Sequence, residues 1–156
     1  MKVLLVLVAL CGAAAADVHT NKSAKVTVDV PKTYKMTEQD DVMRGESDDK
    51  AVALLYWNVD TGDMDEAIKK LTQELYSTVG SLQWGKPTAA KVHGLDAKWI
   101  DGTGRTLGKS LDLRVVLAGP TATKKHVMVI GIVDHAKADA HKAEIDGILK
   151  SLKPAK

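Results

Sequence analysis

Four apolar segments between residues 88 and 134 restrict the possible folds of this chain more than any other feature. Each is rich in β-branched and aliphatic residues, and the links between them carry glycine, proline and aspartate, as turns do. The segments are Thr88–Val92, Ala97–Asp101, Leu111–Ala118 and Val127–Asp134. Because a parallel connection needs about a dozen residues, such short links favour antiparallel neighbours. The sequence therefore predicts an antiparallel sheet.

Further strands are predicted before this group. Lys25–Val30 carries valine at alternate positions and is followed by Pro31, a pattern typical of a strand that stops there. Ala51–Val59 is apolar almost throughout, which indicates burial on both faces. Shorter extended stretches are predicted near Tyr34 and near Met43.

Two other segments repeat apolar residues at intervals of three and four, which is the period of an amphipathic helix. In the first, predicted as a helix over 63–82, the apolar positions are Met64, Ile68, Leu71, Leu75, Val79 and Leu82. Asp63 and Glu66 form its expected capping box. The second helix is predicted over 137–152. The expected fold class is α+β: an antiparallel β-sheet of about six strands packed between two amphipathic helices, in an α/β/α sandwich.

The N-terminus has the pattern of a secretory signal peptide. Lys2 precedes the apolar run Val3–Leu10, and an Ala-x-Ala pair at Ala14 and Ala16 ends just before Asp17. The run is far shorter than the roughly twenty residues of a membrane-spanning helix. We therefore expect cleavage between Ala16 and Asp17. The expected organisation is a cleaved signal peptide over 1–16, a flexible mature N-terminus over 17–24 and a single α+β domain over 25–153.

Cys11 offers an alternative fate for this segment, namely lipid attachment as in bacterial lipoproteins. The preceding residue, Leu10, is bulkier than the small residue that such processing requires. We accordingly predict an exported protein, periplasmic or secreted, with membrane contact only if Cys11 is lipidated.

Composition excludes several kinds of site. Cys11 is the only cysteine, so cleavage after Ala16 would leave no disulfide, cysteine metal site or thiol nucleophile. The chain has 22 Lys and Arg against 20 Asp and Glu, and the basic residues are scattered, so nucleic-acid binding is not expected. Asn21-Lys22-Ser23 is a glycosylation sequon, relevant only in a eukaryotic host.

Two motifs come close to known catalytic or nucleotide-binding signatures. Gly102–Ser110 resembles a phosphate-binding loop, but the first glycine is misplaced and a strand follows where the motif requires a helix. We interpret this segment as a glycine-rich hairpin. Asp60-Thr61-Gly62 matches the aspartic protease triplet, yet it occurs once and a helix begins directly after it, so we interpret it as a turn.

Asp134, His135, Asp139 and His141 are candidate metal ligands, because carboxylates and imidazoles bind divalent cations. His141 lies on the apolar stripe of the second helix, however, which favours a partly buried structural histidine and a solvated His135. Trp57, Trp84 and Trp99 are expected to pack in or near the core.

The layout over residues 25–153 resembles the superfamily of PsbP-like, DcrB-like and Mog-type Ran-binding proteins. Four features carry it: Val28–Pro31 with Tyr34, the strand Ala53–Tyr56 before helix 63–82, Val92–Ala97, and Val129–Val133 with Ile145–Leu152. The resemblance implies an antiparallel sheet sandwiched by helices, with an accessory or binding role and no catalytic role typical of the superfamily. We also expect no cofactor.

We therefore expect an exported, non-enzymatic binding module whose partner is a protein or an envelope component. Two alternatives stay open. One is a small metal-dependent hydrolase using Asp134, His135, Asp139 or His141. The other is an apolar-ligand carrier with a cavity lined by the tryptophans.

Overall fold

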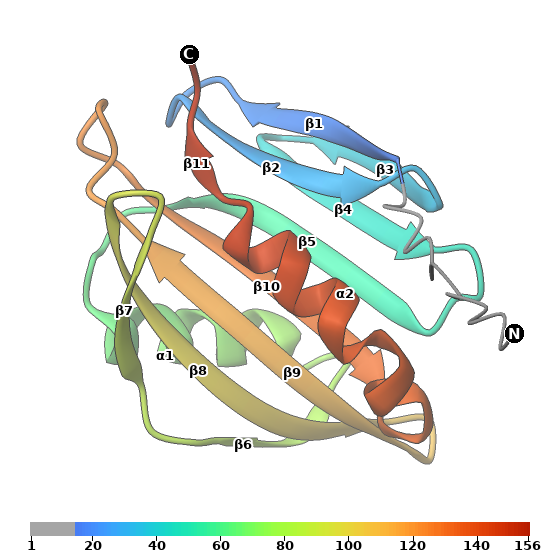
Figure 1. Cartoon of the computed structure of the whole chain (residues 1–156). Coiled ribbons are helices and arrows are strands. Elements are labelled where there is room, and N and C mark those ends of the chain that lie inside the picture. The colour runs from blue at the N-terminus through green and yellow to red at the C-terminus, as the bar shows by residue number, and fades with distance from the viewer. Residues whose placement is uncertain (1–14) are drawn as a thin grey trace, which may run out of the picture.

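The structure is a computed structural model that describes residues 15–156 (Figure 1). The predicted signal peptide, including Cys11, lies outside the described residues except for Ala15 and Ala16. The strands are β1 Ala16–Asn21, β2 Val26–Pro31, β3 Tyr34–Gln39, β4 Val42–Ser47, β5 Val52–Val59, β6 Gly80–Trp84, β7 Thr88–Val92, β8 Leu95–Thr106, β9 Lys109–Ala118, β10 His126–Asp134 and β11 Lys153–Pro154. The helices are α1 Met64–Leu75, the 3₁₀ turn η1 His135–Lys137 and α2 Ala138–Lys150.

The strands form two antiparallel sheets. The larger has eight strands in the order β3-β4-β5-β10-β9-β8-β6, with β7 also paired to β8, and the smaller has the order β1-β2-β11. The α+β class and the antiparallel pairing are confirmed. The expected number of about six strands is wrong, because the stretches near Tyr34 and Met43 form a full hairpin, β3–β4, and because β1, β6 and β11 were not predicted.

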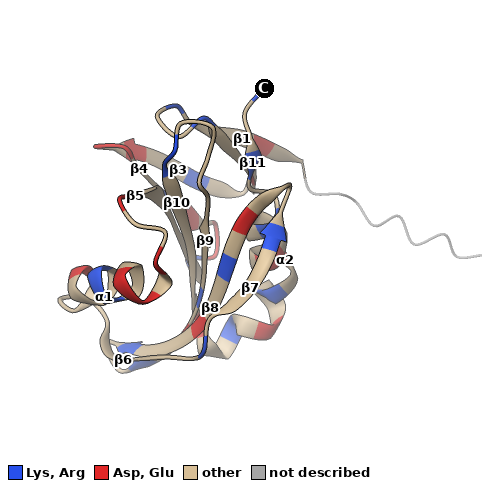
Figure 2. Ribbon diagram, turned by 90° about the vertical axis from the view of Figure 1, so that its left-hand side faces the viewer, with Lys and Arg blue, Asp and Glu red and all other residues tan. Residues whose placement is uncertain are grey.

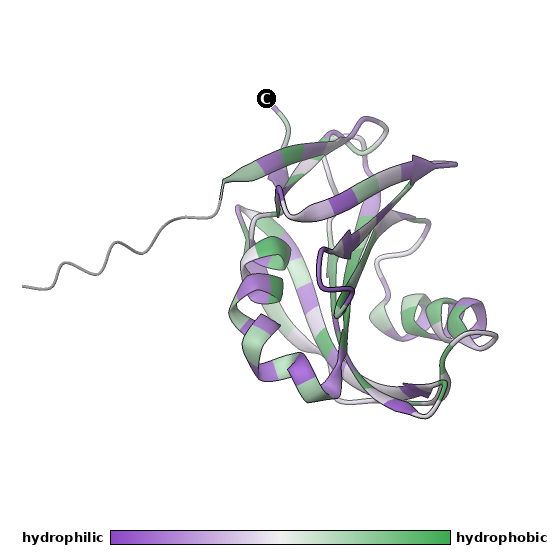
Figure 3. Ribbon diagram, turned by 90° about the vertical axis from the view of Figure 1, so that its right-hand side faces the viewer, coloured by the Kyte–Doolittle hydropathy of each residue, from purple (hydrophilic) through white to green (hydrophobic). Residues whose placement is uncertain are grey.

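Helices α1 and α2 lie on opposite sides of the large sheet, as Figures 2 and 3 show edge-on. The apolar stripe of α1 is buried with the side chains of β9 and β10 that face it; this cluster includes Met64, Ala67, Ile68, Leu71, Leu113, Val115, Met128 and Ile130. The stripe of α2 is buried on the other face together with β2; that cluster includes Ile145, Ile148, Leu149, Leu152, Val26, Val28, Val30, Val116 and Val129. Alternation along β9 and β10 thus supplies both layers of core. Neither helix of the described residues has the length and apolarity needed to cross a membrane.

The glycine-rich segment is a hairpin, as predicted. β8 and β9 pair through Thr106 and Lys109, and the turn between them consists of Leu107 and Gly108, both with positive φ (44° and 80°). Gly102 lies so close to Trp84 that a Cβ on the glycine would come within 2.5 Å of the ring. Glycine at this position serves packing against β6 rather than phosphate binding.

Helix α1 begins as predicted and ends early. The Asp63 carboxylate accepts a hydrogen bond from the amide of Glu66 (2.9 Å), so Asp63 caps the start of the helix. The Asp60-Thr61-Gly62 triplet lies in the short segment that leads from β5 to this cap. The helix ends at Leu75 rather than at Leu82. Val79 donates its amide to the Leu75 carbonyl (2.7 Å) and then leads into β6. The apolar stripe continues past the helix because Val79 and Leu82 reach the same core from a turn and a strand.

The expected flexible segment over 17–24 is corrected. Residues 16–21 form β1, in which Asp17 pairs with Val30 and Asn21 with Val26. The strand β1 was not predicted because it has no buried apolar face. Main-chain hydrogen bonds to β2 hold it in place. Asn21 is buried, and its side chain accepts hydrogen bonds from the Ala24 amide (2.9 Å) and the Ser23 hydroxyl (3.2 Å). The folded domain therefore does not present the sequon asparagine to solvent.

Candidate functional site

A polar groove of about 290 Å³ runs between α2 and the sheet. Its floor is formed by β8, β9 and β10, and its wall by α2. The polar lining residues are Asp101, Thr103, Asp112, Arg114, Asp139, Lys142 and Asp146. Gly131 in β10 brings the helix close, since a Cβ there would lie 2.7 Å from Ile145 Cγ2. The groove forms where this apolar contact gives way to polar residues on β8 and β9.

Arg114 organises this groove. Its Nε and Nη2 donate to the two carboxylate oxygens of Asp101 (2.7 and 3.0 Å), and its Nη1 donates to Asp146 of α2. The hydrogen bonds to Asp101 raise the pKa of the guanidinium above its ordinary value, although partial burial works against them. Arg114, Asp101 and Asp146 are thus paired with one another, and Asp112 is paired with His135. Of the charged residues that line the groove, Asp139 and Lys142 form no ion pair within residues 15–156.

A second groove, of about 390 Å³, joins the first. Both are lined by Thr103 and Asp112, and the second extends towards β6. Its lining residues include Ser81, Gln83, Arg105, Ser110 and His135. His135 Nδ1 lies 2.9 and 3.1 Å from the carboxylate oxygens of Asp112. The two grooves together present hydroxyl, amide, carboxylate and guanidinium groups, which can hydrogen-bond a polar ligand or the polar side chains of a protein.

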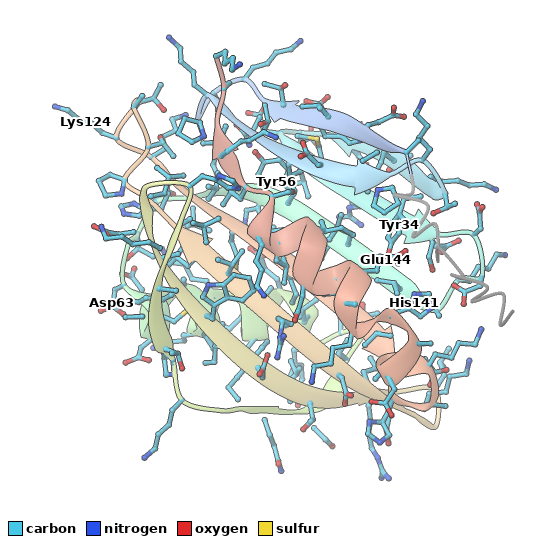
Figure 4. All side chains as sticks on the ribbon, in the orientation of Figure 1. Tyr34, Tyr56, Asp63, Lys124, His141 and Glu144 are labelled. Atoms are coloured by element: carbon cyan, nitrogen blue, oxygen red, sulfur yellow. The ribbon has the colours of Figure 1, made fainter. Side chains whose placement is uncertain are left out.

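A separate hydrogen-bond cluster lies beside the first half of α2 (Figure 4). His141 Nε2 donates to Asp49 (3.1 Å), His141 Nδ1 donates to Glu144 (3.2 Å), and the Tyr34 hydroxyl donates to the same Glu144 oxygen (2.7 Å). Lys137 also donates to Asp49 (3.1 Å). Carboxylate oxygens only accept, so both contacts of His141 are hydrogen bonds when both of its nitrogens carry protons. In that form the cluster ties α2 to β3 and to the β4–β5 turn through an imidazolium.

The pKa shifts in this cluster follow from its contacts. Burial lowers the pKa of His141, but hydrogen bonds with Asp49 and Glu144 outweigh it, so the net shift is upward. The Ser47 hydroxyl and then the Ala51 amide, with His141, lower the pKa of Asp49 well below its usual range. Burial, together with the hydrogen bond to Glu144, raises the pKa of Tyr34 above its usual range. The charged forms of the histidine and of Asp49 are thus favoured together.

The four predicted metal ligands have different partners. Asp134 accepts from the Ala136 amide (3.1 Å) and pairs with Lys109, and Asp139 lies on the rim of the first groove. His135 and His141 contact the separate carboxylates described above. Within residues 15–156, no group of three His, Cys, Asp or Glu side chains is placed to hold a metal ion. His141 lies between its two carboxylates rather than beside them, so these side chains do not converge on one point.

Sequence reasoning missed the residues that organise the site, namely Asp49, Asp101, Arg114 and Glu144. Only one pair had a readable signal: in a hairpin that turns at Leu107 and Gly108, Asp101 and Arg114 face each other directly. The tryptophans pack as expected, Trp57 and Trp84 against the α1 cluster and Trp99 against the α2 cluster. None of them lines either groove.

Comparisons with known proteins identify the fold. No protein-family model matches the chain, and no curated protein sequence matches it. Among solved structures, it is similar to cyanobacterial PsbP (CyanoP) from Synechocystis sp. PCC 6803, with a TM-score of 0.68 at 9% identity, covering 91% of this chain and 94% of that one. The Saccharomyces cerevisiae Ran-binding protein Mog1p aligns with a TM-score of 0.62 at 11% identity, covering 92% and 97% of the two chains.

A third similar structure is LpqN, involved in cell envelope biogenesis of Mycobacterium tuberculosis. It aligns with a TM-score of 0.54 at 12% identity over 91% of each chain. Identities this low establish the fold alone. The chain therefore has the fold shared by PsbP and Mog1, as its layout led us to expect.

Proposed function

We propose that this protein is an exported, non-enzymatic accessory module that binds a protein or an envelope component through the two joined grooves beside α2. The observation that carries the proposal is the Arg114 arrangement. It makes the centre of the groove a pre-formed polar surface, in which Arg114 is paired with both Asp101 and Asp146. Such a surface suits recognition by hydrogen bonding, because a partner that covers Arg114 does not bury an unpaired guanidinium.

The fold neighbours support this reading in general terms. Mog1p is described as a Ran-binding protein, and LpqN as involved in cell envelope biogenesis. The signal-peptide pattern at residues 1–16 supports an extracytoplasmic site of action. Mass spectrometry of the exported protein tests this point: we expect Asp17 as the first residue, whereas a lipidated Cys11 would indicate an anchored form and an intact N-terminus would contradict export.

Site-specific photo-crosslinking in the native host tests the binding surface. A photoreactive residue at Thr103, which lines both grooves and is exposed, should yield a discrete adduct. The same residue at Lys69, exposed on α1 across the sheet, is the matched control and should yield none. Adducts from Lys69 but not from Thr103 would reject the grooves as the binding surface.

A hydrolase is the second candidate, and one observation favours it. Asp112 holds His135 in the groove that Ser81 and Ser110 also line, so a carboxylate, an imidazole and a hydroxyl share one surface. We expect no turnover of simple esters or amides by the purified protein. Turnover that His135→Ala abolishes while the melting temperature is unchanged would replace the binding proposal with a hydrolase.

A further inference from the structure

The end of the molecule farthest along β2 from Pro31 gathers lysines that are scattered in the sequence. Lys22 and Lys25 lie in the β1–β2 turn, Lys124 and Lys125 in the β9–β10 loop, and Lys156 at the C-terminus. All five side chains are exposed. Figure 2 shows blue segments from these parts of the chain at the upper end of the molecule, and Figure 4 shows Lys124 extending away from the body. We refer to these five residues as the lysine cluster.

Hydrogen bonds hold the three segments of the lysine cluster together. The Thr123 hydroxyl donates to the carbonyl of Ser23 (3.0 Å), which joins the β9–β10 loop to the β1–β2 turn. The amide of Ala155 donates to the carbonyl of Lys25 (2.9 Å), which joins the C-terminus to the same turn. The backbone segments that carry the five lysines are therefore joined at one end of the molecule.

The cluster is not neutralised from within the protein. Among the ion pairs of residues 15–156, none involves a side chain of the five lysines. The neighbouring β7–β8 hairpin contributes Asp96, which already pairs with Lys91 (2.7 Å). Asp60, in the β5–α1 loop, lies at the same end because Val59 pairs with His126, and it offsets only part of the charge.

Two of the five lysines lie on strained backbone. Lys25 and Lys124 have φ of 53° and 60°, a left-handed conformation that six other non-glycine residues among 15–156 also adopt. Substitution of either lysine therefore changes a strained position as well as a charge.

We propose that the lysine cluster docks this protein onto a lipid bilayer surface that carries anionic phospholipid headgroups. The lysines lie on turns and a chain end, and none lines either groove, so the surface suits a broad anionic plane rather than a small ligand. Lysine is a compact point charge on a long stem, which matches diffuse attraction to headgroups, whereas arginine or aromatic residues would indicate bidentate or base-stacking recognition. This inference uses different residues from the proposed function and is independent of it.

Vesicle flotation with the full chain tests the docking. One set of vesicles contains phosphatidylcholine alone, and the other also contains phosphatidylglycerol. The readout is the partition coefficient into anionic vesicles divided by the partition coefficient into neutral vesicles. Apolar attraction by the N-terminal segment contributes equally to both coefficients and therefore drops out of the ratio. We expect a clear preference for anionic vesicles that weakens as salt rises, because headgroup attraction is screened.

The decisive variant replaces Lys22, Lys25, Lys124 and Lys125 with glutamine. The matched control replaces four other exposed lysines with glutamine, Lys35, Lys69, Lys86 and Lys150, so that the net charge changes equally. The ratio should fall about tenfold or more in the cluster variant and much less in the control. If the quadruple variant unfolds, K22Q/K125Q, which avoids the strained positions, should give a smaller fall in the same direction.

Three results would overturn the proposal. Equal losses in the cluster and control variants would reduce the effect to net charge. Equal partitioning of the wild type into both vesicle types would exclude anionic headgroups. Retention by soluble polyphosphate or by an acidic protein, without vesicle binding, would assign the cluster to a different partner. None of these outcomes bears on crosslinking from Thr103, so failure here is distinguishable from failure of the proposed function.

Discussion

Helices α1 and α2 cover opposite faces of one sheet, but different interactions hold them there. Within residues 15–156, one hydrogen bond between side chains joins α1 to a strand, from Trp84 Nε1 to Thr72 Oγ1 (2.9 Å); the rest of its contact is apolar. α2 combines an equally buried stripe with polar ties from Asp146, His141 and Glu144. The difference teaches that an apolar stripe is enough to position a helix. The polar ties of α2 therefore mark the side of the fold where a binding surface is to be sought.

The largest expected effects test whether the two apolar stripes are equivalent. Leu71 of α1 and Leu149 of α2 are both almost completely buried. We expect Leu71→Ala and Leu149→Ala each to lower the free energy of unfolding by about 3 kcal/mol, because each leaves a cavity in a packed layer. Urea titration measures both. A loss below about 1 kcal/mol for Leu149→Ala alone would mean that the polar ties, not the stripe, hold α2.

The next effect concerns the close approach of α2 to β10. An alanine Cβ at position 131 would meet Ile145 at 2.7 Å, so we expect Gly131→Ala to destabilise the fold by about 1–3 kcal/mol. Gly147 of the same helix faces open space and is the matched control. Gly147→Ala should stabilise the protein by about 0.5–1 kcal/mol through helix propensity. Thermal melts of the two variants should therefore move in opposite directions, and a shared direction would contradict the packing described here.

These two helices also show how far the sequence could predict the structure. The period of apolar residues located both helices and the core face of each, because burial of a stripe is a local property of sequence. The same period placed the end of the first helix too late, because Val79 and Leu82 continue the spacing although they lie in a turn and a strand. It also missed β1, which is held by main-chain pairing that leaves no apolar pattern.

The polar site was much less predictable. His141 and Asp49 are 92 residues apart, and nothing local in either segment indicates that they meet. The four candidate metal ligands are close in sequence, yet the turn at η1 and the start of α2 direct them to different partners. Asp101 and Arg114 are the exception, because hairpin register alone places them opposite each other. Ion pairs between distant elements depend on the completed fold, so sequence spacing carries little information about them.

A smaller loss of stability is expected when Arg114 is replaced. This β9 residue pairs with Asp101 of β8 and with Asp146 of α2. Its side chain is 30% exposed, so solvent weakens the pairing, and we expect Arg114→Met to cost about 1 kcal/mol. A double-mutant cycle with Asp146→Asn should show coupling of about 0.5–1 kcal/mol, and the same cycle with the distant Asp65→Asn should show none. Zero coupling with Asp146 would remove one of the polar ties that distinguish α2 from α1.

The smallest expected effect is the pH dependence of the His141 cluster. Folding raises the pKa of His141, so the native protein binds this proton more tightly than the unfolded chain does. Its contribution to stability is therefore complete below the unfolded pKa of about 6.5 and is lost as pH rises through the higher folded value. Asp49 has the opposite sign: its depressed pKa contributes above about pH 4 and is lost on further acidification. Between these limits both groups are charged and the cluster is intact.

Comparison of wild type with His141→Gln isolates the histidine, because glutamine can still donate one hydrogen bond but carries no charge. The difference in melting temperature between the two proteins should be greatest near pH 5.5 and should shrink towards pH 8.5. Thr72→Val removes the polar contact of α1 without removing a titratable group, so its difference from wild type should be the same at both pH values. A His141→Gln difference that stays constant, or grows with pH, would show that the imidazole is neutral in the fold. In that case the tie between α2 and the β4–β5 turn would depend on Lys137 rather than on His141.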